Sequence, residues 1–308
     1  MTLKDVLDAQ HPPAEFDLSH EELVQFFWKY RGLSKRWERA NAFWEATNAN
    51  LKTAYEKLDE KDRELEHAYN VIQEDLEVAS RIQSALLPVA STEMTRDLEI
   101  AVYHRQLAEV GGDYFDYFKM SGGQHAIGVF DISGHGVSAA LVMTYLKARF
   151  MGLMDTTDSP KTIVDAVNDS SFAFLKSVKK YATVNFVVFE QDLIRYVCGG
   201  GFGMLLHGDQ ELHFEKKDHF LGLRNKPFHE HTLPFVEGDL LALYTDGIPE
   251  GQNNAMEDYS IHRINALIRQ HADKPVAEIV DLCLDDYSRF RAKDTDDITL
   301  AILRKKKP

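Results

Sequence analysis

Four short motifs, each with one or two aspartates, occur in succession along the chain, at points where apolar runs meet turns. They cover residues 109–113 (EVGGD), 131–136 (DISGHG), 244–247 (YTDG) and 296–299 (DDIT). Carboxylates gathered from several strand ends are the ligands that hard divalent cations such as Mg²⁺ and Mn²⁺ require. Two such cations can activate a water and hold the oxygens of a phosphoryl group. The pattern therefore predicts a two-metal hydrolase.

Each motif taken alone also fits an ordinary turn. Gly111 and Gly112 allow a ligand to approach the backbone closely at Asp113. The adjacent carboxylates of Asp296 and Asp297 would repel each other unless cations or donors compensated them. Ordinary turns explain poorly why all four motifs occur together.

Other residues of these motifs leave alternatives open. The carbonyl of Ile132 is well placed to add a backbone ligand beside Asp131. His135 fits a metal ligand, a proton donor or a structural turn residue. Arg105 fits a phosphate contact, but an ion pair is the preferred interpretation. His229 and His231 alternate along a strand and resemble a metal pair only superficially.

Composition narrows the function classes. The 308 residues are 44% hydrophobic, which suffices for one large core plus an extension. The formal charge is −14, from 35 basic and 49 acidic residues, which argues against a nucleic-acid partner. Cys198 and Cys283 are expected to be buried, reduced thiols.

The chain also gives no sign of a membrane segment. No apolar region follows Met1, and no run approaches the roughly 20 apolar residues of a membrane span. We therefore expect a soluble, cytoplasmic protein with no membrane partner.

A long helix is predicted before the motifs. Ser19 and Glu22 fit a capping box, with Leu18 and Leu23 as its hydrophobic staple, so the helix should begin at His20. Pro88 should stop it. Apolar residues then recur every seven positions, at Leu23, Tyr30, Trp37, Trp44, Leu51, Leu58, Leu65, Ile72, Ala79 and Leu86.

This column, beside a weaker one that contains several polar residues, predicts a coiled-coil seam and a homodimer. The alternative is one amphipathic helix that lies on its own catalytic domain. The poor helix propensity of residues 47–50 predicts a division at this point. The expected organisation is a helical regulatory region at 1–50, a coiled-coil linker helix at 51–88 and a catalytic domain at 89–308.

The catalytic domain is predicted to be an α+β sandwich. Strands are expected at 98–103, 126–131, 183–189, 193–198, 202–207, 211–215, 229–235, 239–244 and 298–303. Helices are expected at 136–151, 160–178, 260–271 and 275–290.

The motifs and their spacing resemble the bacterial PPM-type, PP2C-like serine/threonine phosphatases of the SpoIIE/RsbU family. The resemblance covers roughly residues 75–304. It rests on residues 79–88 (ASRIQSALLP), 109–116 (EVGGDYFD), 131–141 (DISGHGVSAAL), 237–250 (EGDLLALYTDGIPE) and 296–300 (DDITL). It implies a central β-sandwich flanked by helices, with two Mn²⁺ or Mg²⁺ ions at its edge. The N-terminal coiled-coil region predicted from the heptad pattern would precede this domain.

By the same resemblance, Asp113 would hold one metal and Asp131 would bridge both, with the Ile132 carbonyl as a further ligand. Asp246 and Asp296 would complete the other shell, and Asp297 stands where eukaryotic relatives carry Asn. The implied reaction removes phosphate from phosphoserine or phosphothreonine. The implied substrate is a STAS-domain anti-sigma-factor antagonist. The leading hypothesis adds an upstream activator that acts at the N-terminal helices.

One segment departs from the family pattern, because Phe202 stands where many relatives carry a histidine. This difference concerns the substrate loop and leaves the metal aspartates intact. The alternative function is a non-catalytic scaffold with a phosphatase-like fold in a partner-switching pathway.

Overall fold

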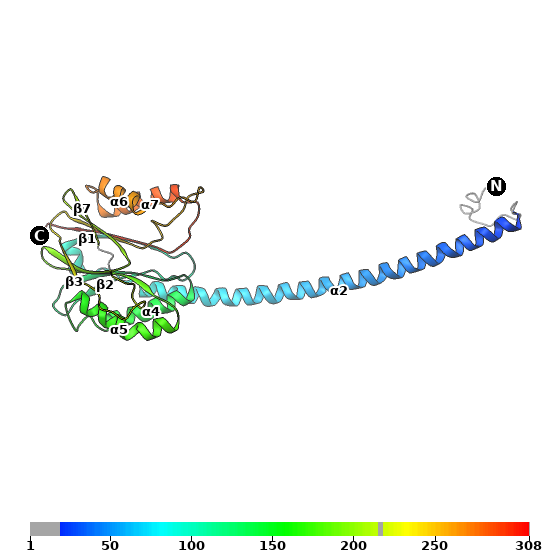
Figure 1. Cartoon of the computed structure of the whole chain (residues 1–308), viewed down its shortest axis with the longest axis horizontal. Helices are drawn as coiled ribbons and strands as arrows, with labels where there is room; N and C mark the ends of the chain where they lie inside the picture. The colour runs from blue at the N-terminus through cyan, green and yellow to red at the C-terminus, as the bar shows by residue number, and fades with distance from the viewer. Residues whose placement is uncertain (1–18, 215–217, 308) are drawn as a thin grey trace. The chain divides into compact units, whose positions relative to one another are not determined.

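A computed structural model describes residues 19–214 and 218–307 of the chain. The chain divides into two compact units, Met1–Gln73 and Glu74–Pro308. The helix α2 (His20–Leu86) occupies the described part of the first unit, and its last turns belong to the second (Figure 1). No helix within the described ranges combines the length and the apolarity needed to cross a bilayer.

The predicted start and end of α2 are confirmed. The Glu22 N–H donates to Ser19 Oγ at 3.3 Å, and the Ser19 N–H donates to Glu22 Oε2 at 2.8 Å, which is the reciprocal pattern of a capping box. The helix ends at Leu86, two residues before Pro88. The predicted staple falls outside the description, because Leu18 and the side chain of Leu23 are not part of it.

The predicted break at residues 47–50 is wrong, because α2 continues through it. Thr47 Oγ1 donates to the Phe43 carbonyl at 2.8 Å, and Thr53 Oγ1 donates to the Ala49 carbonyl at 3.0 Å. These side chains thus bond within the helix instead of competing with it, and strong helix formers flank the segment. The functional division at residue 50 stays a prediction.

The second unit contains two antiparallel, five-stranded sheets. In spatial order, the first consists of β1 (Leu98–Arg105), β10 (Ile298–Lys305), β9 (Leu240–Tyr244), β6 (Phe202–His207) and β7 (Gln210–His213). The second consists of β2 (Tyr114–Lys119), β3 (His125–Ile132), β4 (Ala182–Phe189), β5 (Leu193–Gly199) and β8 (His231–Pro234). The predicted α+β sandwich is confirmed.

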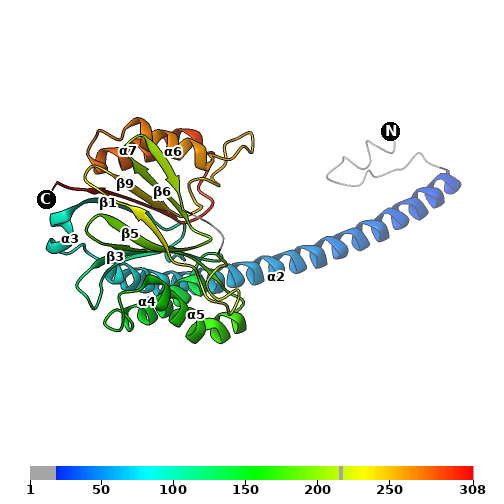
Figure 2. The same ribbon diagram turned by 60° about the vertical axis from the view of Figure 1, so that its left-hand side comes forward.

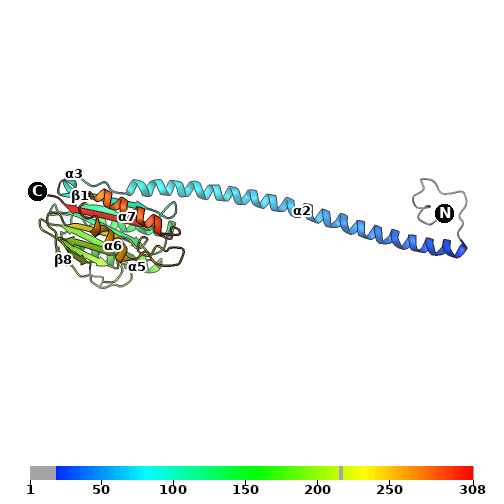
Figure 3. The same cartoon turned by 90° about the horizontal axis from the view of Figure 1, so that it is seen from above.

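Helices cover both outer faces of this sandwich (Figure 2). They are α4 (Val137–Met151) and α5 (Pro160–Ser177) on the β2–β8 sheet, and α6 (Ile261–Gln270) and α7 (Val276–Phe290) on the β1–β7 sheet. Figure 3 shows the pair α6 and α7 from above. Three apolar cores result, one between the sheets and one under each pair of helices.

Two elements were absent from the prediction, β2 and the short helix α3 (Thr92–Asp97). The sequence of β2, YFDYFK, is rich in aromatic residues that favour strands. Its charged and glycine-rich surroundings hid this signal. Ser91 caps α3 by accepting a hydrogen bond from the Met94 N–H at 3.1 Å.

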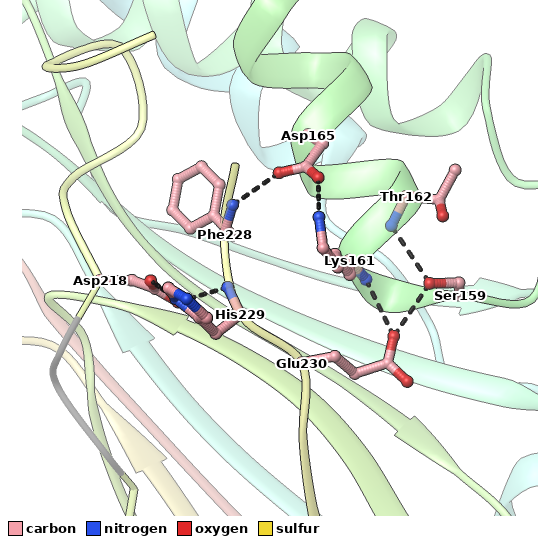
Figure 4. Close-up of polar contacts among 8 residues, drawn as sticks. All are labelled: Ser159, Lys161, Thr162, Asp165, Asp218, Phe228, His229 and Glu230. Atoms are coloured by element: carbon pink, nitrogen blue, oxygen red, sulfur yellow. Dashed lines mark hydrogen bonds and ion pairs between the residues drawn. The ribbon is translucent and has the colours of Figure 1, made fainter. Parts of the chain in front are cut away.

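The strand predicted at 229–235 is shorter in the structure, because the segment before β8 binds α5 (Figure 4). The Phe228 N–H donates to Asp165 Oδ1 at 2.7 Å. Ser159 Oγ, at the N-cap of α5, donates to Glu230 Oε2 at 2.9 Å. The Phe228 N–H and the Glu230 side chain are therefore bound to α5, and the chain joins the sheet only from His231.

Candidate metal centre

The sheet topology brings the first two motifs together. β2 and β3 are antiparallel neighbours, with Tyr114 opposite Phe130. Asp113 directly precedes β2, and Asp131 is the penultimate residue of β3. Because an antiparallel strand starts where its neighbour ends, both aspartates lie at the same edge of their sheet.

The last two motifs meet in the same way in the other sheet. β9 and β10 are antiparallel neighbours, with Tyr244 opposite Leu300. Asp246 follows β9 by two residues, and Asp297 directly precedes β10. Asp246, Asp296 and Asp297 therefore gather at one edge.

Two threonines join these edges across the sandwich. The hydroxyls of Thr245 and Thr299 both donate to Asp113 Oδ2 at 2.7 Å. The Thr299 N–H in turn donates to Thr245 Oγ1 at 3.0 Å. Thr245 and Thr299 come from one sheet and Asp113 from the other, so the four motifs form one site. Both threonines were missed as site residues, although they stand inside the quoted motifs.

Asp297 organises the loop that carries Asp113. Its Oδ2 accepts hydrogen bonds from the N–H groups of Gly112 at 2.6 Å and Asp113 at 3.3 Å. Its Oδ1 accepts from the Leu107 N–H at 2.7 Å. Hydrogen bonds thus connect the first and last motifs directly. The three hydrogen bonds from backbone N–H groups to the Asp297 carboxylate are charge-assisted.

Glycines permit the motifs to approach each other closely. A Cβ on Gly112 would lie 2.8 Å from the Ile132 carbonyl oxygen, inside van der Waals contact. A Cβ on Gly247 would collide with the Asp297 carbonyl oxygen. The glycines at these two positions are therefore required by backbone proximity between motifs.

The site strongly disfavours unneutralised negative charge. Burial, followed by the negative charges of Asp246 and Asp296, raises the pKa of Asp131 to about 8. Burial and then the charge of Glu250 raise the pKa of Asp246 to about 6.

The pKa values of Asp113 and Asp296 are also raised, mainly by burial. Burial and then the charge of Asp131 raise the pKa of Asp113, while the hydroxyls of Thr245 and Thr299 oppose the rise. Burial is also the main cause that raises the pKa of Asp296. A divalent cation would offset the repulsion and replace the protons.

A cavity of about 260 Å³ opens beside the carboxylates. Its walls are Asp246, Gly247, Glu250, Gln252, Thr295 and Asp296. Glu250 was missed as a site residue, although it closes the quoted segment 237–250. Through this cavity a small polar group can reach the carboxylates of Asp246 and Asp296.

The donor chemistry fits Mg²⁺ or Mn²⁺, because the gathered groups are carboxylate and carbonyl oxygens. Over residues 19–214 and 218–307, no three His, Cys, Asp or Glu side chains are arranged to hold a metal ion as they stand. Asp113 and Asp297 instead point oxygens at protein donors. The fit therefore rests on donor type and on the charge that the site must neutralise.

The remaining candidates have other positions. Arg105 forms an ion pair with Asp294 at 2.5 Å, as the preferred interpretation had it. His229 Nδ1 lies 2.7 Å from Asp218 Oδ1 (Figure 4), and His231 stacks on Tyr196.

Two further residues lie near the second motif or in the departing segment. His135 is exposed, and its protonated form would oppose the rise in the pKa of Asp296. Phe202 stacks on Tyr244, with ring centroids 5.8 Å apart. It thus packs against the strand that leads to Asp246.

Comparison with known sequences identifies relatives of this domain. The family described as Stage II sporulation protein E (SpoIIE) matches residues 121–306, more than half of the chain. Phosphoserine phosphatase RsbP of Bacillus subtilis (strain 168) is 25% identical over 227 residues, which cover 68% of this chain and 52% of RsbP. Phosphoserine phosphatase RsbU of the same organism is 25% identical over 251 residues, covering 76% and 71%. The chain thus spans about half the length of RsbP.

Solved structures agree on the fold. The SiaA-PP2C domain of Pseudomonas aeruginosa superimposes with a TM-score of 0.69 at 20% identity, over 77% of this chain and 98% of that domain. The catalytic domain of the serine/threonine phosphatase PstP, in complex with two manganese ions, gives 0.52 at 16% identity, over 68% and 99%. The chain therefore has the PP2C fold and belongs to the SpoIIE family.

Proposed function

We propose that this chain is a metal-dependent protein serine/threonine phosphatase that acts on a phosphorylated regulatory protein. One observation carries the proposal. Four acidic motifs from two sheets meet at one end of the sandwich, where burial and mutual repulsion raise the pKa of Asp131 to about 8. The phosphoserine phosphatases RsbP and RsbU among the relatives support the same activity.

In this proposal Asp113 would hold one cation, Asp131 would contribute to both, and Asp246 and Asp296 would hold the second. The Ile132 carbonyl would add a ligand. Asp297 is proposed to contribute to the metal shell as well. The three N–H groups that it accepts support a second duty, which is to fix the loop that carries Asp113.

Two Mn²⁺ or Mg²⁺ ions held there would supply Lewis-acid activation of a water molecule and neutralise phosphoryl charge. The protein's share is positioning. The hydroxyls of Thr245 and Thr299, which donate to Asp113, fix the rotation of its carboxylate. The cavity beside Asp246 and Asp296 admits the phosphate. The carboxyl group of Asp131 gives up its proton when cations bind near neutral pH.

The proposed substrate is a phosphoserine or phosphothreonine on a STAS-domain protein of a partner-switching pathway. The support is the resemblance of the motifs to the SpoIIE/RsbU family, with which the family match agrees. The departure at Phe202 makes the substrate loop the place where this chain would differ from its relatives in selectivity.

The proposed regulation acts through a homodimer of α2 that receives an upstream activator near its N-terminal end. Within the described residues of the first unit, the large apolar side chains of the heptad column are exposed, including Trp37 at 68% and Leu65 at 69%. A second copy would cover such a column in a coiled coil.

The test measures phosphate release from p-nitrophenyl phosphate and from a phosphoserine peptide, with Mn²⁺ and with EDTA. We expect turnover with Mn²⁺ that EDTA abolishes. Asp131→Asn should lose turnover, whereas Asp273→Asn, an exposed control, should keep it.

If the full-length protein shows no turnover, there are two explanations, and a truncated protein distinguishes them. Turnover by residues 75–308 would mean that the N-terminal helix inhibits or awaits its activator. If neither protein shows turnover and calorimetry detects no Mn²⁺ binding, the phosphatase proposal is overturned and the non-catalytic scaffold is favoured.

A further inference from the structure

In the last turns of α2, a polar side chain is buried while its apolar neighbour is exposed. Gln83 is polar and only 4% exposed, whereas its neighbour Ile82 is apolar and 59% exposed. Both belong to the same compact unit as the two sheets. Burial of an uncharged polar group is tolerated only where its hydrogen bonds are made.

Gln83 makes those bonds to a single residue of the first aspartate motif. Its Nε2 donates to the Gly111 carbonyl at 2.8 Å. The Gly111 N–H donates to its Oε1 at 3.1 Å. The side-chain amide therefore pairs with both backbone groups of a buried glycine that stands two residues before Asp113.

The loop is thus held from two elements that are far apart in the sequence. Asp297, before β10, accepts hydrogen bonds from the next two N–H groups, those of Gly112 and Asp113. Gln83 holds the residue before them. Of these two holders, Gln83 is the one that moves with α2.

We propose that Gln83 is a positioning residue for the candidate metal centre, and that it transmits the position of α2 to Asp113 through Gly111. The inference rests on the proposed function and names how that site is regulated. A small rotation or shift of the end of α2 breaks both hydrogen bonds, because each needs a donor and acceptor within about 3.2 Å. Two buried backbone groups then lose their partners, and the loop moves to find others.

The main variant is Gln83→Met, which keeps the unbranched shape and removes both hydrogen bonds. Ser84→Ala, one position along on an exposed side of the helix, is the matched control. Calorimetry at pH 7 should give a Mn²⁺ Kd about tenfold weaker for Gln83→Met, which corresponds to about 1.4 kcal/mol. Turnover at saturating Mn²⁺ and the KM for the phosphopeptide should stay within twofold.

Hydrogen exchange without metal gives a readout independent of turnover. Peptides covering residues 107–113 should exchange faster in Gln83→Met than in the wild type and in Ser84→Ala. Loss of stability alone would lower the melting temperature without weakening Mn²⁺ binding by the folded protein. Should Gln83→Met fail to fold, Gln83→Asn replaces it, because its amide is one methylene too short to reach Gly111.

The outcomes separate the two proposals. Unchanged Mn²⁺ affinity together with unchanged exchange at 107–113 overturns the role of Gln83. A wild-type protein that binds Mn²⁺ without turnover overturns the phosphatase activity, and the Kd ratio still decides the role of Gln83. A wild-type protein that binds no Mn²⁺ leaves the decision on positioning to hydrogen exchange.

Discussion

The two units of this chain treat their apolar side chains in opposite ways. In Glu74–Pro308, strand β9 is buried at every position, and the apolar residues of β3, β4 and β10 fill the layers on either side of the sheets. In the described part of Met1–Gln73, the large apolar side chains stand on the surface of a single helix, with Phe43 as much as 75% exposed.

The difference shows what each unit needs in order to be stable. The sandwich closes its cores with its own strands and helices. A lone helix in water gains little from propensity and normally depends on the burial of an apolar face. The exposed apolar column of the first unit therefore supports the proposed coiled-coil dimer, whereas the second unit closes its own apolar cores.

The largest effect should come from a change that touches only the domain. Asp246→Asn removes a carboxylate from the cavity of the candidate centre. Turnover should fall by more than roughly 100-fold, because Asp246 is a proposed direct ligand and loss of a residue that only supports a ligand already costs up to about that factor. Sedimentation should show the same oligomeric state as the wild type. A change of oligomeric state would contradict the assignment of the proposed dimer contacts to the first unit.

The reciprocal change touches only the helix. Leu58→Asp with Leu65→Asp places charges in the predicted seam, and each leucine is worth about 1.5–3 kcal/mol when buried. Analytical ultracentrifugation should show a dimer weakened by more than roughly 100-fold, with an unchanged melting temperature of the domain. Lys57→Asp with Glu64→Asp, one position earlier in each case, should leave the dimer intact. A monomeric wild type would refute the seam.

The loop held by Asp297 tests how far the domain depends on one side chain. Asp297→Ala leaves three backbone N–H groups without their acceptor. The free energy of unfolding should fall by about 2–4 kcal/mol in denaturant titrations of metal-free protein. Asp297→Asn, which keeps one acceptor oxygen, should lose less, and Asp273→Ala should lose almost nothing. Equal losses for Asp297→Ala and Asp273→Ala would contradict this account.

The raised pKa of Asp131 predicts a pH dependence that is confined to the domain. Its folded pKa is about 8, whereas an unfolded aspartate titrates near about 3.9, so the folded state holds the proton more tightly. This contribution to stability is complete below about pH 4 and is lost as the pH rises toward about 8.

In EDTA, the melting temperature should therefore fall from pH 5 to pH 8, and Mn²⁺ should restore it. Mn²⁺ binding at pH 7 should also release protons, seen as a binding enthalpy that varies with the buffer. Asp131→Asn should flatten the pH slope. A slope that persists in this variant would assign the effect to other groups.

The smallest effect belongs to the start of α2. Ser19→Ala removes the side-chain half of the capping box and should cost about 1 kcal/mol of local helix stability. Hydrogen exchange of the first helical turn should quicken, while exchange within the sheets stays constant. Ser84→Ala, an exposed serine near the other end of the same helix, serves as the control.

Much of this architecture could be predicted from local signals. Strand and helix positions followed from apolar periodicity, and the ends of α2 followed from Ser19, Glu22 and Pro88. The convergence of the aspartate motifs followed from their place at strand ends. The family match agrees with the resemblance that the motifs suggested.

What escaped prediction depends on partners that are distant in the sequence. Thr299 and Gln83 reach Asp113 and Gly111 across 186 and 28 positions, and no local pattern encodes such pairs. The break expected at residues 47–50 failed for the opposite reason. Propensity is a weak local preference, and hydrogen bonds such as that from Thr47 to Phe43 are compatible with a continuous helix.

The place of β10 has a consequence for the birth of the protein on the ribosome. This strand is made after all the others, yet it lies inside its sheet, between β1 and β9. It pairs Leu98 with Lys305, and the residues just before it supply Asp296 and Asp297. The candidate metal centre therefore cannot be complete until β10 has left the exit tunnel and has entered its place between β1 and β9. A nascent chain with this topology therefore lacks the site on which the proposed phosphatase activity depends.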